Sequence, residues 1–215
     1  MPTANVTVRY RRAVEKLRFL ADRCQWTTRL PVDEPFLHEA YVFGEILDGA
    51  DPVECLDVVF ALNLPPEEVP WCSQPPGTAW LVDNLRLDKG GIAYGWRSRH
   101  EPVGNHVIRD PVRFWSLDGT DEAVLDALRE RRFADLSRLT ASTTEVQRRT
   151  AMELDRALAR LRAVHRAYWD RDWRREHRGN GRYPEDHLWE AVNGYLETLE
   201  AANRLRGDAG GRPPR

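Results

Sequence analysis

Apolar residues recur at three- and four-residue intervals near both ends of the chain, which is the period of an amphipathic helix. Near the N-terminus such a stripe predicts a helix over 9–24; its members are Val14, Leu17, Leu20, Ala21 and Cys24. Two further stripes run from Leu154 to Tyr168 and from Leu188 to Ala202. The segment 178–184 between them contains Gly and Pro, so we predict an antiparallel helical hairpin.

In the middle of the chain the apolar runs are short and rich in β-branched and aromatic residues, which favours strands. The predicted strands are 39–44, 55–63, 79–87, 91–97 and 105–115, the last interrupted or ended by Pro111. We expect 79–87 and 91–97 to form a hairpin, and a helix over 122–131 to be capped by Thr120 or Asp121. The run 55–63 is apolar on both faces, as a central strand is. We expect it beside 41–43, with Val42 and Phe60 in one core.

Together these elements predict an α+β fold with a small mixed sheet, an N-terminal helix and a C-terminal antiparallel helical hairpin. We expect an α+β domain over residues 1–140, with the hairpin over 141–206 packed on it. The tail over 207–215 consists largely of Gly, Pro and Arg, and we expect it to be disordered.

Composition excludes several classes of function. The net charge is −2, so we expect only weak long-range attraction to nucleic acid or anionic lipid, although a local basic patch could still exist. The three cysteines form no CxxC pair, and no apolar run approaches the ~18 residues of a membrane span. We therefore expect a cytoplasmic protein without a metal site or cofactor. Arginine supplies 30 of the 32 basic residues, which is typical of a GC-rich bacterial genome.

The stretch Val42–Gly49, followed by Cys55–Val59, resembles the core of the polymerase-β-like nucleotidyltransferases. In that family a Gly-Ser turn grips nucleotide phosphates, and an Asp-x-Asp pair with a third carboxylate holds two metal ions. The resemblance gives Gly44 the glycine of the turn and Asp57 the second aspartate. It makes Asp83, on the predicted strand 79–87, the third carboxylate.

Two positions depart from the family pattern. Glu45 stands where the serine belongs, which adds negative charge beside the phosphates, and Cys55 replaces the first aspartate. The resemblance therefore implies that catalysis is lost. The overall layout also resembles an uncharacterised bacterial family known as a domain of unknown function.

A second candidate site is the connection Trp96–His106, which concentrates donors, acceptors and titratable groups between two predicted strands. Either histidine could move a proton, and the arginines could bind a carboxylate or phosphate. The alternative is a solvated loop whose side chains satisfy one another. The candidate binding residues here are Arg97, Arg99, His100, Asn105 and His106.

A third stretch, Tyr168–Arg178, interleaves aromatic residues with arginines, as nucleic-acid platforms do, although nearby acidic residues cancel much of the charge. The interpretation we favour is a helix end that packs Trp169 and Trp173, which share one face, on the sheet domain. Our leading hypothesis is that the chain is a catalytically degenerate nucleotidyltransferase-like protein that now acts as a binding or regulatory protein. The alternatives are an active enzyme that uses the His100/His106 loop and a structural interaction protein. The ligand could be a small molecule or nucleotide, and a protein partner could bind the C-terminal helices.

Overall fold

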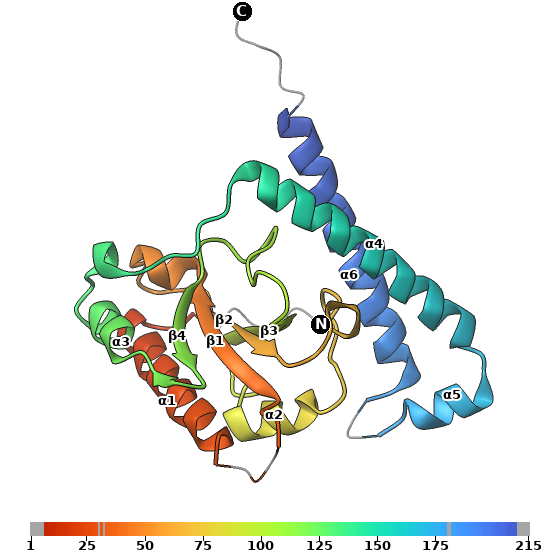
Figure 1. The fold of residues 1–215 in the computed structure, drawn as a ribbon, viewed down its shortest axis with the longest axis horizontal. Coiled ribbons are helices and arrows are strands. Elements are labelled where there is room, and N and C mark those ends of the chain that lie inside the picture. The colour runs from red at the N-terminus through yellow and green to blue at the C-terminus, as the bar shows by residue number, and fades with distance from the viewer. Residues whose placement is uncertain (1–6, 30, 32, 180–181, 210–215) are drawn as a thin grey trace, which may run out of the picture. The chain divides into compact units, whose positions relative to one another are not determined.

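The computed structural model describes residues 7–29, 31, 33–179 and 182–209. Over these residues the fold is α+β, as predicted (Figure 1). The helices are α1 (Tyr10–Thr27), α2 (Thr78–Leu85), α3 (Glu122–Arg129), α4 (Thr143–Ala167), α5 (Arg171–Glu176) and α6 (Pro184–Ala209). The strands are β1 (Leu37–Phe43), β2 (Leu56–Leu62), β3 (Ile92–Ser98), β4 (Val112–Ser116) and β5 (Gly119–Thr120). Short 3-10 turns are η1 (Gly44–Asp48), η2 (Pro66–Glu68) and η3 (Phe133–Asp135).

The strands form one mixed sheet in the order β3-β2-β1-β4-β5. β2 pairs antiparallel with β1 and parallel with β3, so it is enclosed on both sides, as its continuous apolar run predicts. Phe43 lies opposite Asp57 in the β1–β2 register. Val42 and Phe60 are both fully buried, which confirms that these two strands share a core.

One face of the sheet is covered by α1, which contacts β1, β4 and β5, and α3 packs against both α1 and β4 (Figure 1). Trp115 on β4 is fully buried, and its indole N–H donates to Gln25 Oε1 of α1 at 3.1 Å. Asp121 caps α3 by accepting from the Val124 backbone N–H at 3.1 Å. This bears out one of the two predicted caps.

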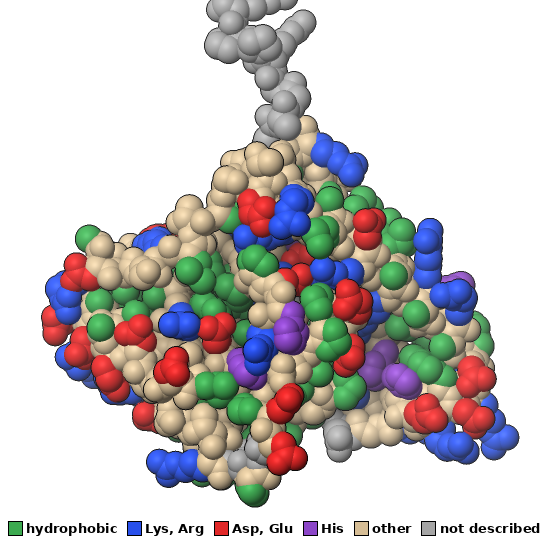
Figure 2. Space-filling view, viewed as in Figure 1, with side chains coloured by type: hydrophobic (Ala, Val, Ile, Leu, Met, Phe, Trp, Pro, Cys, Tyr) green, Lys and Arg blue, Asp and Glu red, His purple; other side chains and the backbone are tan. Residues whose placement is uncertain are grey.

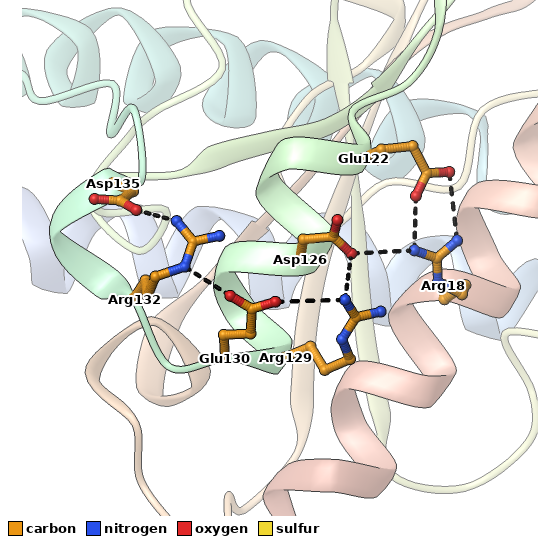
Figure 3. Close-up of polar contacts among 7 residues, drawn as sticks. All are labelled: Arg18, Glu122, Asp126, Arg129, Glu130, Arg132 and Asp135. Atoms are coloured by element: carbon orange, nitrogen blue, oxygen red, sulfur yellow. Dashed lines mark hydrogen bonds and ion pairs between the residues drawn. The ribbon is translucent and has the colours of Figure 1, made fainter.

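A chain of surface ion pairs runs along α3 (Figure 3). Arg18 of α1 reaches Glu122 at 2.6 Å and Asp126 at 3.8 Å, which joins the two helices. The chain continues through Arg129, Glu130, Arg132 and Asp135. Because these side chains are largely exposed, each pair contributes about 0–1 kcal/mol, and the apolar contact between α1 and the sheet dominates this layer.

The chain divides into two compact units, one of residues 1–66 and 76–141, the other of 67–75 and 142–215. In the second unit α4 packs along α6, which gives the predicted helical hairpin, and α5 lies in the connection. Leu158 and Leu199 of the predicted stripes are only half-buried. Most of the buried positions in these two helices are small or polar instead; they include Thr150, Glu153, Ala157, Ala191, Thr198, Ala201 and Ala202. Within the predicted tail, residues 207–209 belong to α6, and 210–215 lie outside the described residues.

One predicted strand is wrong, and another is shorter than predicted. Segment 79–87 is mostly helix α2, because its buried residues Thr78, Leu81 and Leu85 recur at three and four positions. The predicted hairpin of 79–87 with 91–97 is therefore absent, and β3 pairs with β2 instead. Of 105–115 only the part from Val112 is strand, because Asn105 Oδ1 accepts the N–H groups of Val107 and Ile108 and holds a turn.

Candidate functional site

Gly44 and Asp57 lie side by side where β1 passes into η1. Gly44 has a φ of +77°, a left-handed conformation that glycine adopts without strain. A Cβ placed on Gly44 would lie 2.6 Å from Asp57 Oδ2. The glycine therefore serves both the backbone geometry and the close approach of the carboxylate.

The surroundings of Asp57 are acidic. The Cys55 thiol donates to Asp57 Oδ1 at 3.3 Å, and the Glu54 backbone N–H donates to Glu45 Oε2 at 2.9 Å. Burial raises the pKa of Asp57, and the neighbouring Glu45 and Glu54 raise it further, against the opposing effect of the Cys55 hydrogen bond. Burial, with Asp57 beside it, also raises the pKa of Cys55 to about 12, so the thiol stays protonated at neutral pH.

The structure does not assemble the three-carboxylate arrangement that the nucleotidyltransferase resemblance implies. Asp83 is an exposed residue of helix α2, not of a third strand. Within the described ranges, no group of three or more His, Cys, Asp or Glu side chains is arranged to hold a metal ion. Negative charge at Glu45, Glu54 and Asp57 also opposes the binding of a phosphate at this turn.

Replacing Gly44 with alanine is expected to lower the free energy of unfolding by about 1–3 kcal/mol, from the left-handed φ and the clash with Asp57. Urea denaturation of Gly44→Ala, Asp57→Ala and the double variant separates the contribution of the left-handed backbone from that of the clash with Asp57. The double variant should lose less stability than the sum of the single variants, because the clash is absent when residue 57 is alanine. Strict additivity would contradict the close approach.

In the Trp96–His106 connection the polar residues divide between the interior and the surface. Arg97 is only 2% exposed and pairs with Glu101 at 3.3 Å. Asn105 is also buried and holds the turn that precedes Ile108. Ser98 Oγ donates to the Leu64 carbonyl at 2.6 Å and accepts from the His100 backbone N–H at 3.1 Å. These contacts hold the connection in place.

The remaining candidates of this connection lie at different depths. Arg99 is exposed, with Nη1 2.9 Å from Nε2 of the His38 ring, and His100 is exposed as well. His106 is half-buried, and both of its ring nitrogens are shielded from solvent. Interior Arg97 and Asn105 therefore do not share one open surface with Arg99 and His100, and an acid–base pair of histidines stays a prediction.

A polar cluster in the second unit joins segment 67–75 to α6. Glu197 accepts hydrogen bonds from Trp71 Nε1 at 2.7 Å, Asn193 Nδ2 at 2.8 Å and Cys72 Sγ at 3.3 Å. Burial, followed by the neighbouring Glu197, raises the pKa of Cys72 to about 12, which makes this thiol unreactive. Gly194 permits the approach, because a Cβ there would lie 2.3 Å from the Trp71 carbonyl oxygen.

An arginine cluster lies in the same unit. Glu190 of α6 pairs with Arg160 of α4 at 3.0 Å through one carboxylate oxygen and with Arg182 through the other. Arg182 also donates to the Gln74 carbonyl at 3.2 Å. Burial lowers the pKa of Arg160, against the opposing effect of Glu190. Two guanidinium groups thus share one largely buried carboxylate.

Aromatic and histidine side chains gather where α5 joins α4 to α6, and we call this region the aromatic end. Its members are Tyr168, Trp169, Trp173, His177, Tyr183, His187 and Trp189. Trp173 stacks on His177 with ring centroids 4.1 Å apart, and His187 meets His177 edge-on at 4.8 Å. Figure 2 shows histidine side chains beside hydrophobic ones over this part of the molecule. Trp169 is 83% exposed, Trp189 67% and Tyr183 54%.

His187 gives this region a dependence on pH. Burial lowers its pKa to about 4, and the neighbouring Arg182, His177 and Arg160 contribute to the shift. The unfolded chain, with a histidine pKa near 6.5, therefore binds a proton that the folded chain rejects. Stability should fall as pH decreases from about 6.5 to about 4.

Substitution of His187 by glutamine should flatten this decline, because glutamine does not titrate. Thermal unfolding of the variant between pH 7 and 4 measures how much of the decline in stability remains. His165→Gln is the matched control, because His165 is an exposed histidine on α4. The prediction is wrong if the wild-type decline persists in His187→Gln.

Sequence reasoning missed the clusters around Glu197 and Glu190, because their members come from segments far apart in the chain. A usable signal was present in the Tyr168–Trp189 stretch, which holds three of the eight tryptophans together with two histidines, His177 and His187. That signal predicts a stacked cluster, yet it does not predict which rings are exposed.

Comparison with known proteins identifies one family. A family model described as Domain of unknown function (DUF7711) matches residues 8–204. Searches of curated proteins and of solved structures found no match. Among the described residues, none of the helices combines the length and apolar character needed to cross a membrane.

Proposed function

The chain belongs to the DUF7711 family of unknown function, and we propose that it is a binding or regulatory protein whose aromatic end engages a protein partner. The observation that carries the proposal is the exposure of Trp169 and Tyr183, in the connection between α4 and α6, and of Trp189, near the start of α6. Large exposed aromatic side chains are enriched in the centres of protein interfaces, where they supply much of the binding energy.

The charge of the aromatic end favours a protein over a nucleic acid. Residues 168–190 contain five arginines and six acidic residues, a formal balance of −1. Several of the arginines are already paired, since Arg174 reaches Glu185 at 2.7 Å and Arg175 reaches Asp172 at 3.1 Å. A surface that binds phosphate backbones needs an excess of unpaired positive charge. Aromatic residues with paired arginines suit a mixed apolar and polar protein surface.

The proposal includes the loss of nucleotidyl transfer. Glu45 takes the place of the phosphate-gripping serine, Cys55 is a protonated thiol in place of an aspartate, and Asp83 lies on a helix. We expect no transfer from ATP, GTP, CTP or UTP with magnesium or manganese. A transfer activity that Asp57→Ala abolishes would overturn this part of the proposal.

The partner proposal is tested by affinity capture from a lysate of the source organism, with mass spectrometry of the bound proteins. The full chain is compared with Trp169→Ala/Trp189→Ala and with Trp26→Ala/Trp80→Ala, whose tryptophans are partly exposed on α1 and α2. A protein retained by the wild type and the control, and lost from the aromatic-end variant, supports the proposal. If all three forms of the chain retain the same proteins, the aromatic end is excluded as the binding surface, provided that circular dichroism shows the same helix content in each form.

A further inference from the structure

The arginine cluster carries more positive charge than its visible partners balance. Arg160 and Arg182 meet the single carboxylate of Glu190, and all three side chains are at least three-quarters buried. Glu197, the next carboxylate of α6, is engaged by Trp71, Asn193 and Cys72. An ion kept from water needs a full set of partners, because its desolvation is costly.

Two polar atoms, one in this cluster and one in the adjoining segment 67–75, have no hydrogen-bond partner within the described part of the chain. They are Arg160 Nη1 and Ser73 Oγ, both shielded from solvent, and Ser73 is more than nine-tenths buried. Ser73 stands between Cys72, whose pKa the nearby Arg160 lowers against the effect of burial, and Gln74, whose carbonyl binds Arg182. Buried donors without partners are rare in folded proteins, and each requires a physical reason.

We propose that Arg160, Arg182 and Ser73 form a binding site for a small oxyanion, either a phosphate or the carboxylate of a small metabolite. A planar guanidinium donates to two oxygens of such an anion at once, and a serine hydroxyl supplies a further donor. The two arginines repel a metal cation. The burial of the unpaired atoms favours a small free anion over a side chain of a partner protein. This site is separate from the exposed rings of the aromatic end, so it stands or falls independently of the proposed partner.

His187 provides a spectroscopic reporter for the site. Burial and the neighbouring Arg182 and Arg160 hold its pKa low, so an anion bound at these arginines should raise that pKa. Sulfate keeps its charge throughout the titration of His187, and it therefore serves as the first probe, followed by phosphate and acetate. Sodium chloride at matched ionic strength controls for screening.

The experiment follows the His187 ring protons by NMR during titration of the full chain with each anion. Saturable shifts with sulfate or phosphate, and a raised His187 pKa absent in chloride, support the site. A response to acetate without one to phosphate assigns a carboxylate ligand, and the reverse assigns a phosphate. Equal shifts in chloride and in all the oxyanions would overturn the proposal, because they reflect screening alone.

Variants separate a specific site from a general salt effect. Arg160→Gln should abolish the saturable response, whereas Arg162→Gln, an exposed arginine on the same helix, should retain it. Arg182→Gln provides a second test where Arg160→Gln fails to fold. A saturable response that survives in either folded variant would overturn the assignment to these arginines, and the wild-type titration remains decisive where neither variant folds.

Discussion

Replacement of Trp115 by alanine is expected to lower the free energy of unfolding by about 3–5 kcal/mol. Trp115 is the largest fully buried side chain of the sheet, and it contacts α1 through the hydrogen bond from its indole N–H to Gln25. Its removal leaves a cavity between β4 and α1 and an unpaired amide oxygen on Gln25. For a chain of this size each kcal/mol shifts the melting temperature by roughly 2–4 °C.

Chemical denaturation monitored by circular dichroism measures this loss. Trp26→Ala is the matched control, because Trp26 lies on α1, the helix that Trp115 contacts, and is 40% exposed. The control should change stability by less than 1 kcal/mol. Similar losses in both variants would show that the α1–sheet contact is not centred on Trp115.

The fold was predictable wherever the apolar period was long or continuous. Helix α1 follows from a stripe of five apolar positions, and β2 follows from an apolar run that continues on both faces. Helix α2 was mistaken for a strand because it has only eight residues and includes Trp80 and Val82, which favour strands. Over so short a segment, the periods of helix and strand are hard to distinguish.

Long-range pairing was less accessible than element type. Nothing in 91–97 distinguishes an antiparallel hairpin from the parallel pairing that β3 makes with β2. The depth of Arg97 was also hidden, because a polar run between two predicted strands suggests a solvated loop, whereas the Glu101 ion pair permits burial.

The candidate sites show the same limit. The sequence places Gly44 and Asp57 on consecutive segments, and the β1–β2 register brings them into contact. The clusters around Glu190 and Glu197 depend on the return of α6 along α4 and on segment 67–75, so only the folded chain brings their members together.

The arginine cluster gives the other large prediction: Glu190→Ala should destabilise the second unit by about 3–5 kcal/mol. The carboxylate is the shared partner of Arg160 and Arg182, so its loss leaves two largely buried guanidinium groups facing each other without a counter-charge. Glu190→Gln keeps one hydrogen-bond acceptor and removes the charge. It should therefore lower the stability of the unit by less than Glu190→Ala does, but by a measurable amount.

Urea unfolding followed by far-ultraviolet circular dichroism reports on this unit, because α4 and α6 supply most of the helical residues. Glu185→Ala is the matched control on the same helix, since Glu185 pairs with Arg174 while its side chain is 55% exposed. An exposed pair of this kind contributes about 0–1 kcal/mol. If Glu190→Ala were no more destabilising than Glu185→Ala, the two arginines would have to find other anionic partners in the folded chain, and the charge imbalance on which the oxyanion site rests would disappear.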